Sequence, residues 1–248
     1  MNEQAPAVIT RPAAEECSAA VAALDLGLQA TEAYGRSDLH ARLVTARERL
    51  VDSALTVLVV GEFKQGKSSL VNALIGLDVC PVDDDVATAV PTIVRHGSTA
   101  SARAQQVEDG SWEPVDVDRL REWVSEAGNA GNHRQLQCVE ATVPSRLLAK
   151  GLVLVDTPGA GGLDSSHGAA TAAALPLAEA VVFVTDASQE LTAPELAFLR
   201  QARESCPTVV IAQTKTDLYP TWRDIVDENR RHLSRAGMDL PILPVSSV

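Results

Sequence analysis

A run of nine residues in the first half of the chain has the composition of a phosphate cradle. It reads Gly61-Glu62-Phe63-Lys64-Gln65-Gly66-Lys67-Ser68-Ser69 and satisfies the pattern G-x-x-x-x-G-K-[ST]. In such a loop the backbone N–H groups point at phosphate oxygens at the start of a helix, whose dipole also favours anions. Lys67 would place a positive charge at the β and γ phosphates, and Ser68 would offer a hydroxyl to Mg²⁺. The alternative is a glycine-rich turn without a ligand.

A second polar motif, Asp156-Thr157-Pro158-Gly159, follows the apolar run 152–155. At the carboxyl end of a strand beside the phosphate loop, the Asp156 carboxylate could hold the shell of Mg²⁺ through water, and the Gly159 N–H could meet a γ-phosphate. Ala160-Gly161-Gly162 would let the next segment move when that phosphate leaves. The alternative is a structural turn.

A third motif, Thr214-Lys215-Thr216-Asp217, has the form T-K-x-D and follows the apolar run 208–212. Asp217 can accept two hydrogen bonds from the edge of guanine, whereas adenine presents an acceptor there and lacks one donor. Lys215 can lie along the base and ribose, and Ser246-Ser247 can place backbone groups near the guanine carbonyl. Guanine is therefore the expected base. A solvated helix start is the alternative.

These motifs follow a repeating order of short apolar segments and longer stretches. The expected strands are 56–60, 152–155, 180–185, 208–212 and 241–245, separated by stretches long enough for helices. That alternation predicts an α/β fold with a mostly parallel sheet and helices on both faces, in three layers. Weaker strands at 92–95 and 102–107, on either side of His96-Gly97-Ser98, suggest a hairpin at one edge. A short helix at 118–127 and a polar loop at 128–135 should follow.

Two helices should precede the first strand. Residues 13–33 are rich in alanine, with apolar positions at helical spacing, and Gly35 ends this pattern. A second helix is expected over 38–55, with Ser37 as its N-cap. No linker divides the remainder. We therefore expect a helical segment over 1–55 and one domain over 56–248.

Composition excludes several classes of protein. The 248 residues are 46% hydrophobic and 22% charged, so a sizeable core is expected. Lys and Arg number 21 against 33 Asp and Glu, giving a net charge of −12 that argues against binding nucleic acid. Neither a membrane-spanning run nor a secretory signal is visible, so we expect a cytoplasmic protein. The four cysteines lack C-x-x-C spacing, which favours reduced thiols over zinc or disulfides.

Together, GEFKQGKSSLVNALIG, the segment Thr88-Ala89-Val90-Pro91-Thr92, VLVDTPGAGG, QTKTD and PVSS resemble the GTPase domain of bacterial dynamin-like proteins over residues 56–248. The T-K-x-D form, the paired serines after Lys67 and the insertion before D-x-x-G are more similar to dynamins than to small regulatory or ribosome-associated GTPases. The composition, rich in alanine and arginine, makes the isoniazid-inducible group of actinobacteria a candidate for a closer match. The resemblance implies a P-loop GTPase fold, Mg²⁺ as cofactor and hydrolysis of GTP to GDP and phosphate.

The resemblance also implies roles for single residues. Thr88 matches the switch threonine that closes over Mg²⁺ and helps to seat the attacking water, with Thr92 as the weaker candidate. The implied catalytic residues are Lys64, Lys67, Ser68 and Thr88, and the implied metal-binding residues are Ser68, Thr88 and, through water, Asp156. Asp83-Asp84-Asp85 either disfavours closure of the switch until cations or a partner compensate, or forms a solvated loop.

The group that positions the water is not evident, because Ala160 stands where small GTPases carry glutamine. In the resembled family, backbone and P-loop groups position the water when two GTPase domains meet face to face. Some members bind a monovalent cation, K⁺ or Na⁺, at the P-loop, and guanylate-binding proteins carry an arginine there. Lys64 occupies this position, and we hypothesise that it supplies that charge to the transition state. Alternatively, Lys64 lies in solvent or pairs with an acidic residue across a dimer.

The resemblance names partners as well. It implies binding of GTP and GDP, a homodimer through the GTPase face, and membrane remodelling by the complete protein, peripheral to the inner face of the plasma membrane. The chain stops at Val248, before the last helix, stalk and membrane-binding tip usual in the family, so we expect a truncated piece that reaches lipid through missing segments. Its N-terminal helices would lack their bundle partner and either pack on the sheet or stay partly exposed. The alternatives are a non-membrane regulatory or ribosome-associated GTPase and a nucleotide-binding module of low turnover.

Overall fold

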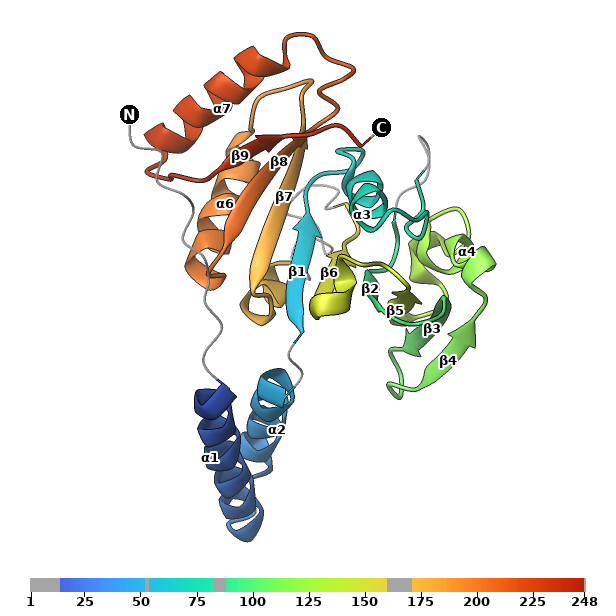
Figure 1. Cartoon of the computed structure of the whole chain (residues 1–248), viewed down its shortest axis with the longest axis vertical. Coiled ribbons are helices and arrows are strands. Elements are labelled where there is room, and N and C mark those ends of the chain that lie inside the picture. Colours follow the sequence, from blue (N-terminus) through green and yellow to red (C-terminus); the bar gives the residue numbers. More distant parts are fainter. Residues whose placement is uncertain (1–13, 52–53, 83–87, 160–170, 248) are drawn as a thin grey trace. The chain divides into compact units, whose positions relative to one another are not determined.

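The computed structural model describes residues 14–51, 54–82, 88–159 and 171–247, which divide into two compact units (Figure 1). One unit comprises Met1–Ala54 and the other Leu55–Val248. The helices are α1 (Ala14–Ala33), α2 (Ser37–Val51), α3 (Lys67–Ile75), α4 (Arg121–Val124), α6 (Ala193–Ser205) and α7 (Trp222–Arg235). The strands are β1 (Leu55–Val60), β2 (Thr92–His96), β3 (Ser101–Gln106), β4 (Trp112–Val115), β5 (Leu136–Val143), β6 (Leu152–Asp156), β7 (Ala180–Asp186), β8 (Val209–Thr214) and β9 (Ile242–Pro244).

The first unit is a hairpin of α1 and α2. The two helices are joined by hydrogen bonds from Arg47 to Asp25 and between Thr31 and His40. A Cβ on Gly27 would lie 3.1 Å from the Leu43 side chain, so a residue without a side chain lets the helices approach closely. Helix α2 begins at Ser37 itself, because the His40 N–H donates to the Arg36 carbonyl. Arg36 rather than the expected Ser37 is therefore the capping position.

The second unit contains a nine-stranded sheet in the order β4-β3-β5-β2-β6-β1-β7-β8-β9. Strands β6, β1, β7, β8 and β9 run parallel, and the apolar, β-branched residues of the first four are mostly buried on both faces. The sheet reverses direction where β2 pairs antiparallel with β6, and β5 is parallel to β2. Five of the eight pairings are parallel, which confirms the expected α/β class with a mostly parallel sheet.

Alternating residues of the central strands build two cores, one on each face of the sheet (Figure 1). On one face Val57 and Val59 of β1 pack with Leu70 and Val71 of α3. On the other face residues of β1, β7 and β8 pack with α6 and α7, among them Leu58, Phe183, Leu199, Ile211, Val226 and Leu233. Helix α6 begins with a capping box in which Thr192 and Glu195 bond to each other's backbone N–H. The structure thus has the expected three layers.

The expected hairpin of 92–95 and 102–107 is wrong, because β5 lies between these strands. Strand β5 pairs with β2 on one side and with β3 on the other. Its central residue, Glu140, is nearly buried, and its carboxylate pairs with Arg103 at 2.6 Å and Arg95 at 3.1 Å. Two flanking arginines therefore satisfy a carboxylate in the middle of the sheet. Strand β4, which also went unpredicted, forms the edge next to β3.

Two smaller expectations are corrected as well. The helix expected over 118–127 is instead a 3₁₀ turn at Val117–Arg119 followed by α4, and the expected loop over 128–135 contains a 3₁₀ turn at Ala130–Asn132. The Asp116 carboxylate caps the first of these turns by accepting from the Asp118 N–H. The segment is short because Ser125 leaves the helical region with an extended backbone.

The core on the α6 face predicts the cost of a cavity. Leu199 of α6 is fully buried, whereas Leu177 is 52% exposed. We expect Leu199→Ala to lower the free energy of unfolding by about 2–5 kcal/mol, through lost burial and the cavity left behind. Leu177→Ala is the matched control and should change it by less than about 0.5 kcal/mol. Urea unfolding measures both, and similar effects for the two variants would contradict the packing described.

Candidate functional site

The phosphate-loop motif connects β1 to α3 at the carboxyl edge of the sheet. Gly61 has φ 149°, and a Cβ there would lie 2.2 Å from the carbonyl oxygen of Val184 in β7. Gly66 has φ 91° and caps α3, and its carbonyl accepts from the Leu70 N–H at 2.9 Å. Both positions require glycine, because a side chain would strain the backbone or collide with β7. The loop is thereby fixed as a turn that leads directly into a helix N-terminus.

Lys67, the first residue of α3, is buried beneath the loop. Its Nζ donates to the Glu62 carbonyl at 2.8 Å. Burial lowers the pKa of Lys67, while the nearby charges of Asp156 and Glu62 oppose that shift. Lys67 as a whole is 6% exposed. A desolvated cation held by one backbone carbonyl has unused donors for an anion at the centre of the loop.

Ser68, Thr88 and Asp156 meet next to Lys67. The Ser68 hydroxyl donates to Asp156 Oδ2 at 2.7 Å and lies 3.5 Å from Thr88 Oγ1. Asp156 is fully buried at the end of β6, and its Oδ1 has no hydrogen-bond partner. Burial raises the pKa of Asp156 to about 6, although the hydrogen bond from Ser68 and the charge of Lys67 lower it. Thr92, the weaker switch candidate, is completely buried in β2.

This group has the chemistry of a magnesium site. Mg²⁺ prefers oxygen ligands and retains several waters, and it is commonly bound through one or two side chains together with phosphate oxygens. Two hydroxyls and a carboxylate with an orphaned oxygen fit that preference, with the carboxylate acting through water. Among the described residues, no group of three or more His, Cys, Asp or Glu could hold a metal.

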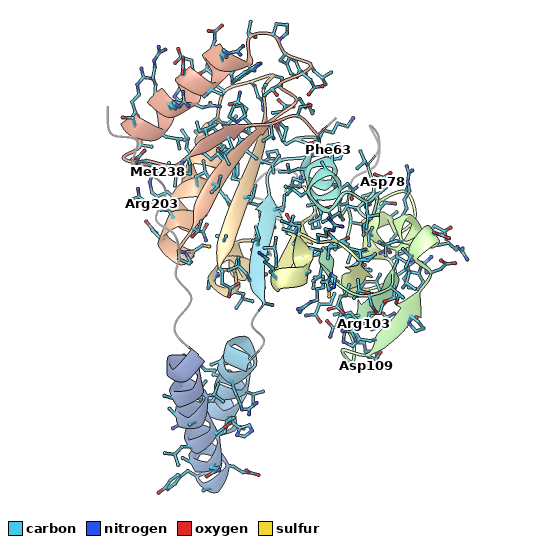
Figure 2. All side chains as sticks on the ribbon, in the orientation of Figure 1. Phe63, Asp78, Arg103, Asp109, Arg203 and Met238 are labelled. Atoms are coloured by element: carbon cyan, nitrogen blue, oxygen red, sulfur yellow. The ribbon has the colours of Figure 1, made fainter. Side chains whose placement is uncertain are left out.

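Gly159, the last residue of the D-x-x-G motif, packs against the backbone of the phosphate loop. A Cβ on Gly159 would lie 2.8 Å from Phe63 Cα, so the two motifs make backbone contact. Phe63 itself is 42% exposed (Figure 2). The Lys64 ammonium lies 5.4 Å from the centroid of the Phe63 ring. The expectations for Asp83-Asp84-Asp85 and for Ala160-Gly161-Gly162 fall outside the described residues.

The T-K-x-D motif is tied to the phosphate loop. Thr214 Oγ1 donates to the Gln65 carbonyl at 2.6 Å. Lys215 has φ 56° and donates to the Lys64 carbonyl at 2.7 Å and to Asp186 Oδ2 at 2.9 Å. The side chain of Lys215 therefore bridges the phosphate loop to the end of β7.

Asp186 was not singled out from the sequence, and Gln65 was named only as one residue of the phosphate loop. Gln65 is buried, and its Oε1 accepts from the Asp186 N–H. Burial tends to raise the pKa of Asp186, but hydrogen bonds from Ser188 and Lys215 hold it below its usual value. The sequence did contain a signal for Asp186, because this residue ends an apolar strand just as Asp156 does. The carboxyl ends of parallel strands share one sheet edge.

The base-recognition residues lie next to one another. The Ser246 hydroxyl donates to Asp217 Oδ1 at 2.8 Å, which links the end of the chain to the T-K-x-D motif. A groove of about 400 Å³ is lined by Ser69, Ala73 and Asn72 of α3, by Val82 and by Ser247. Among the described residues, those of the phosphate loop, D-x-x-G and T-K-x-D motifs thus lie at the start of α3 and at the carboxyl ends of β1, β6 and β8.

The fold and this loop define a nucleotide-binding domain of the P-loop class. A model of the Dynamin family matches residues 57–213. The chain belongs to the dynamin family, as the motifs suggested.

Two relatives and one solved structure illustrate the similarity. The isoniazid-induced protein IniA of Mycobacterium tuberculosis is 46% identical over 217 residues, which cover 86% of this chain and 34% of that protein. Dynamin-like protein A of Bacillus subtilis is 24% identical over 72% of this chain and 15% of its own. The fold of an oligomerised bacterial dynamin pair, described as a mechanism for long-range sensing and tethering of membranes, matches with a TM-score of 0.61 and 18% identity over 94% of this chain and 38% of that one.

The chain spans about a third of the length of the isoniazid-induced relative IniA. Within the described residues, no helix has the length and apolar character needed to cross a bilayer.

The burial of Asp156 predicts a pH-dependent stability for the protein free of nucleotide and Mg²⁺. Because its pKa is raised from 3.8 to about 6, the unfolded state loses this proton first, and stability falls as pH rises between these values. Asp156→Asn removes the effect. We expect the variant to gain on the order of 3 kcal/mol relative to wild type between pH 4 and pH 7. Asp239→Asn at an exposed site controls for loss of a surface charge. A pH-independent difference in urea unfolding would contradict this assignment.

Proposed function

We propose that this chain binds GTP with Mg²⁺ and hydrolyses it to GDP and phosphate. The observation that carries the proposal is the meeting of three motifs at one sheet edge: the phosphate loop, the Ser68 and Asp156 pair, and the Asp217 and Ser246 pair. Membership of the dynamin family supports the same chemistry. The proposed nucleotide-binding residues are Gly61, Glu62, Phe63, Lys64, Gln65, Gly66, Lys67, Ser68, Ser69, Asp156, Gly159, Thr214, Lys215, Asp217, Ser246 and Ser247.

In this proposal each group acts at a defined part of the nucleotide. The Lys67 ammonium binds the β and γ phosphates, and the N–H groups of the loop bind the remaining phosphate oxygens. Ser68, Thr88 and, through water, Asp156 hold Mg²⁺, which supplies charge stabilisation at the β and γ phosphates. Asp217 accepts two hydrogen bonds from the guanine edge. An adenine base offers only one donor on that edge and should bind less well.

The charge that completes the site is proposed to come from Lys64 or from a monovalent cation. Lys64 has φ 62°, a left-handed conformation that directs the chain around the phosphate loop. Its carbonyl already accepts from Lys215, so the loop at this point is fixed by the T-K-x-D motif. A cation at this position would stabilise the negative charge of the transition state.

We further propose that two copies meet through the GTPase face and that the complete protein acts at membranes. The support is family membership together with the described oligomeric state and membrane tethering of the bacterial dynamin pair. In such an arrangement GTP binding would favour the dimer, and hydrolysis would release it.

Turnover measured against protein concentration tests the proposal. We expect phosphate release from GTP, per molecule of protein, to rise with protein concentration as dimers form, and ATP to be a poor substrate. Lys67→Ala should abolish release, because the β and γ phosphates lose their buried cation. Slow release that does not depend on concentration would contradict dimer activation and favour a simple switch or a binding module.

Two further measurements with the same assay determine whether Lys64 or a bound ion supplies the positive charge at the transition state. If Lys64 supplies it, Lys64→Ala lowers stimulated turnover at saturating GTP, and KCl and a salt of a non-coordinating cation support equal rates. If a bound ion supplies it, KCl raises turnover and Lys64→Ala has little effect. Wild-type turnover for Lys64→Ala without stimulation by K⁺ would rule out both sources.

A further inference from the structure

The segment between β2 and β6, residues 97–151, is called the insertion below. It contacts the backbone that carries Thr88 on two sides. Thr88 forms an isolated antiparallel bridge with Ser125. The Ala89 N–H donates to the Val124 carbonyl at 2.7 Å, and the Pro91 carbonyl accepts from the Val139 N–H at 2.9 Å. The first two contacts come from the end of α4 and the third from β5. Thr88 is thus fixed near Ser68 by the protein itself.

The end of α4 is in turn fixed by Asn129, which is fully buried. Its Nδ2 donates to the Trp123 carbonyl at 2.9 Å, its Oδ1 accepts from the Arg134 N–H at 3.0 Å, and its own N–H donates to the Ser125 carbonyl at 2.8 Å. These bonds set the path of Val124 and Ser125, the two residues that pair with the Thr88 segment. Breaking them leaves buried polar groups unpaired and loosens that path.

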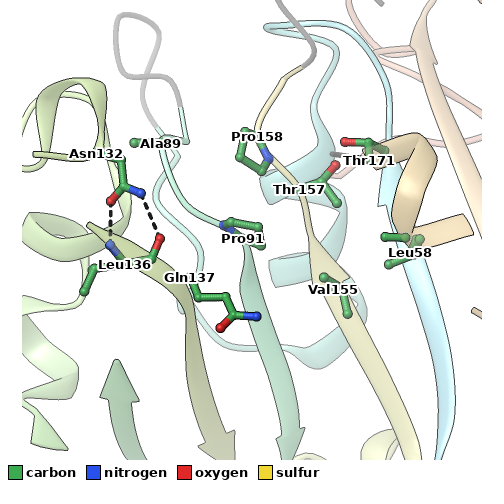
Figure 3. Close-up of a pocket in the computed structure, with 11 residues that line it drawn as sticks. Leu58, Ala89, Pro91, Asn132, Leu136, Gln137, Val155, Thr157, Pro158 and Thr171 are labelled. Carbon is green, nitrogen blue, oxygen red and sulfur yellow. Dashed lines mark hydrogen bonds between the residues drawn. The ribbon is translucent and has the colours of Figure 1, made fainter. Parts of the chain in front are cut away.

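The turn that follows α4 and contains Asn129 has little room for another backbone path. A Cβ on Gly128 would lie 2.5 Å from the backbone of Glu122, so the turn packs directly on α4. Asn132 adds a second anchor, since its side chain donates to the Leu136 carbonyl at 2.8 Å and accepts from the Leu136 N–H at 3.0 Å (Figure 3). Ala89, Pro91 and Asn132 line a cavity of about 330 Å³. Backbone hydrogen bonds therefore add to the packing of Ala89 and Val90 in the core to fix the Thr88 segment.

We propose that Asn129 is a positioning residue for GTP hydrolysis, which it supports by holding Thr88 beside Ser68. The inference rests on the proposed function, in which Thr88 contributes to the Mg²⁺ site of the triphosphate state. A threonine placed in advance does not lose conformational freedom when the ligand binds. Asn129 bonds to residues of the insertion and acts on the site only through the backbone of Ser125 and Val124.

The test combines Asn129→Ala, Thr88→Ala and the double variant, with kcat for GTP and affinity for GDP as the readouts. We expect Asn129→Ala to lower kcat by about 10- to 100-fold, the range expected when a reacting group is misplaced by about 1 Å. GDP affinity should stay at the wild-type value, because the phosphate loop and the T-K-x-D motif are intact. The double variant should match Thr88→Ala alone, since both changes act through one group.

Ser101→Ala is the matched control. It removes a hydrogen bond to Thr142 in the same insertion without touching the Thr88 segment, so kcat should be unchanged. Should Asn129→Ala fail to bind GDP through misfolding, Ser125→Ala decides instead, because it removes only two bonds, the one to the Arg121 carbonyl and the one from the Gly128 N–H.

Three outcomes would overturn the inference. Wild-type kcat for Asn129→Ala shows that the turn does not position Thr88. Independent losses that add up in the double variant show that Asn129 acts by another route. Wild-type kcat for Thr88→Ala overturns both this inference and the proposed role of Thr88, whereas GTP hydrolysis itself is judged separately by Lys67→Ala.

Discussion

The site depends on one buried carboxylate. Asp156 is fully enclosed, one oxygen accepts from Ser68, and the other has no partner. Burying an ionised carboxylate is unfavourable unless it is paired and hydrogen-bonded, which is why the pKa of Asp156 is raised to about 6. Lys67 offsets part of that cost, but its ammonium is itself desolvated. The Cys80 thiol also bonds to Asp156, and in the proposed function a nearby divalent cation would offset the remaining cost of its burial.

Close backbone contacts keep this site in place. Gly61 lies against Val184, Gly159 against Phe63, and Lys215 spans from the phosphate loop to Asp186. The two glycine contacts join backbone to backbone, and Lys215 adds a charged bond at the end of a strand. The central strands thus hold the three motifs at fixed separations, and the insertion extends the same rigidity to Thr88. The three motifs therefore share one ordered edge of the sheet.

Local sequence was sufficient for the five parallel strands and for all three motifs, because apolar β-branched runs and glycine spacing are encoded in neighbouring residues. It was insufficient for β5, since Glu140 interrupts the apolar pattern and its partner Arg103 lies 37 residues away. Asn129 was missed for another reason. Its type favours a surface turn, and only the fold shows that it is buried and bonded to its near neighbours in the chain, Trp123 and Arg134. A distant partner decides the position of Glu140, and burial in the fold decides that of Asn129.

The claim that the burial of Asp156 is offset by Mg²⁺ and nucleotide is tested most directly by equilibrium binding. A non-hydrolysable GTP analogue would be titrated at pH 8, with and without Mg²⁺, into wild type and Asp156→Asn. The account predicts that Mg²⁺ tightens binding to wild type and that Asp156→Asn loses this increment while keeping the Mg²⁺-free affinity. An equal Mg²⁺ increment in both proteins would contradict it.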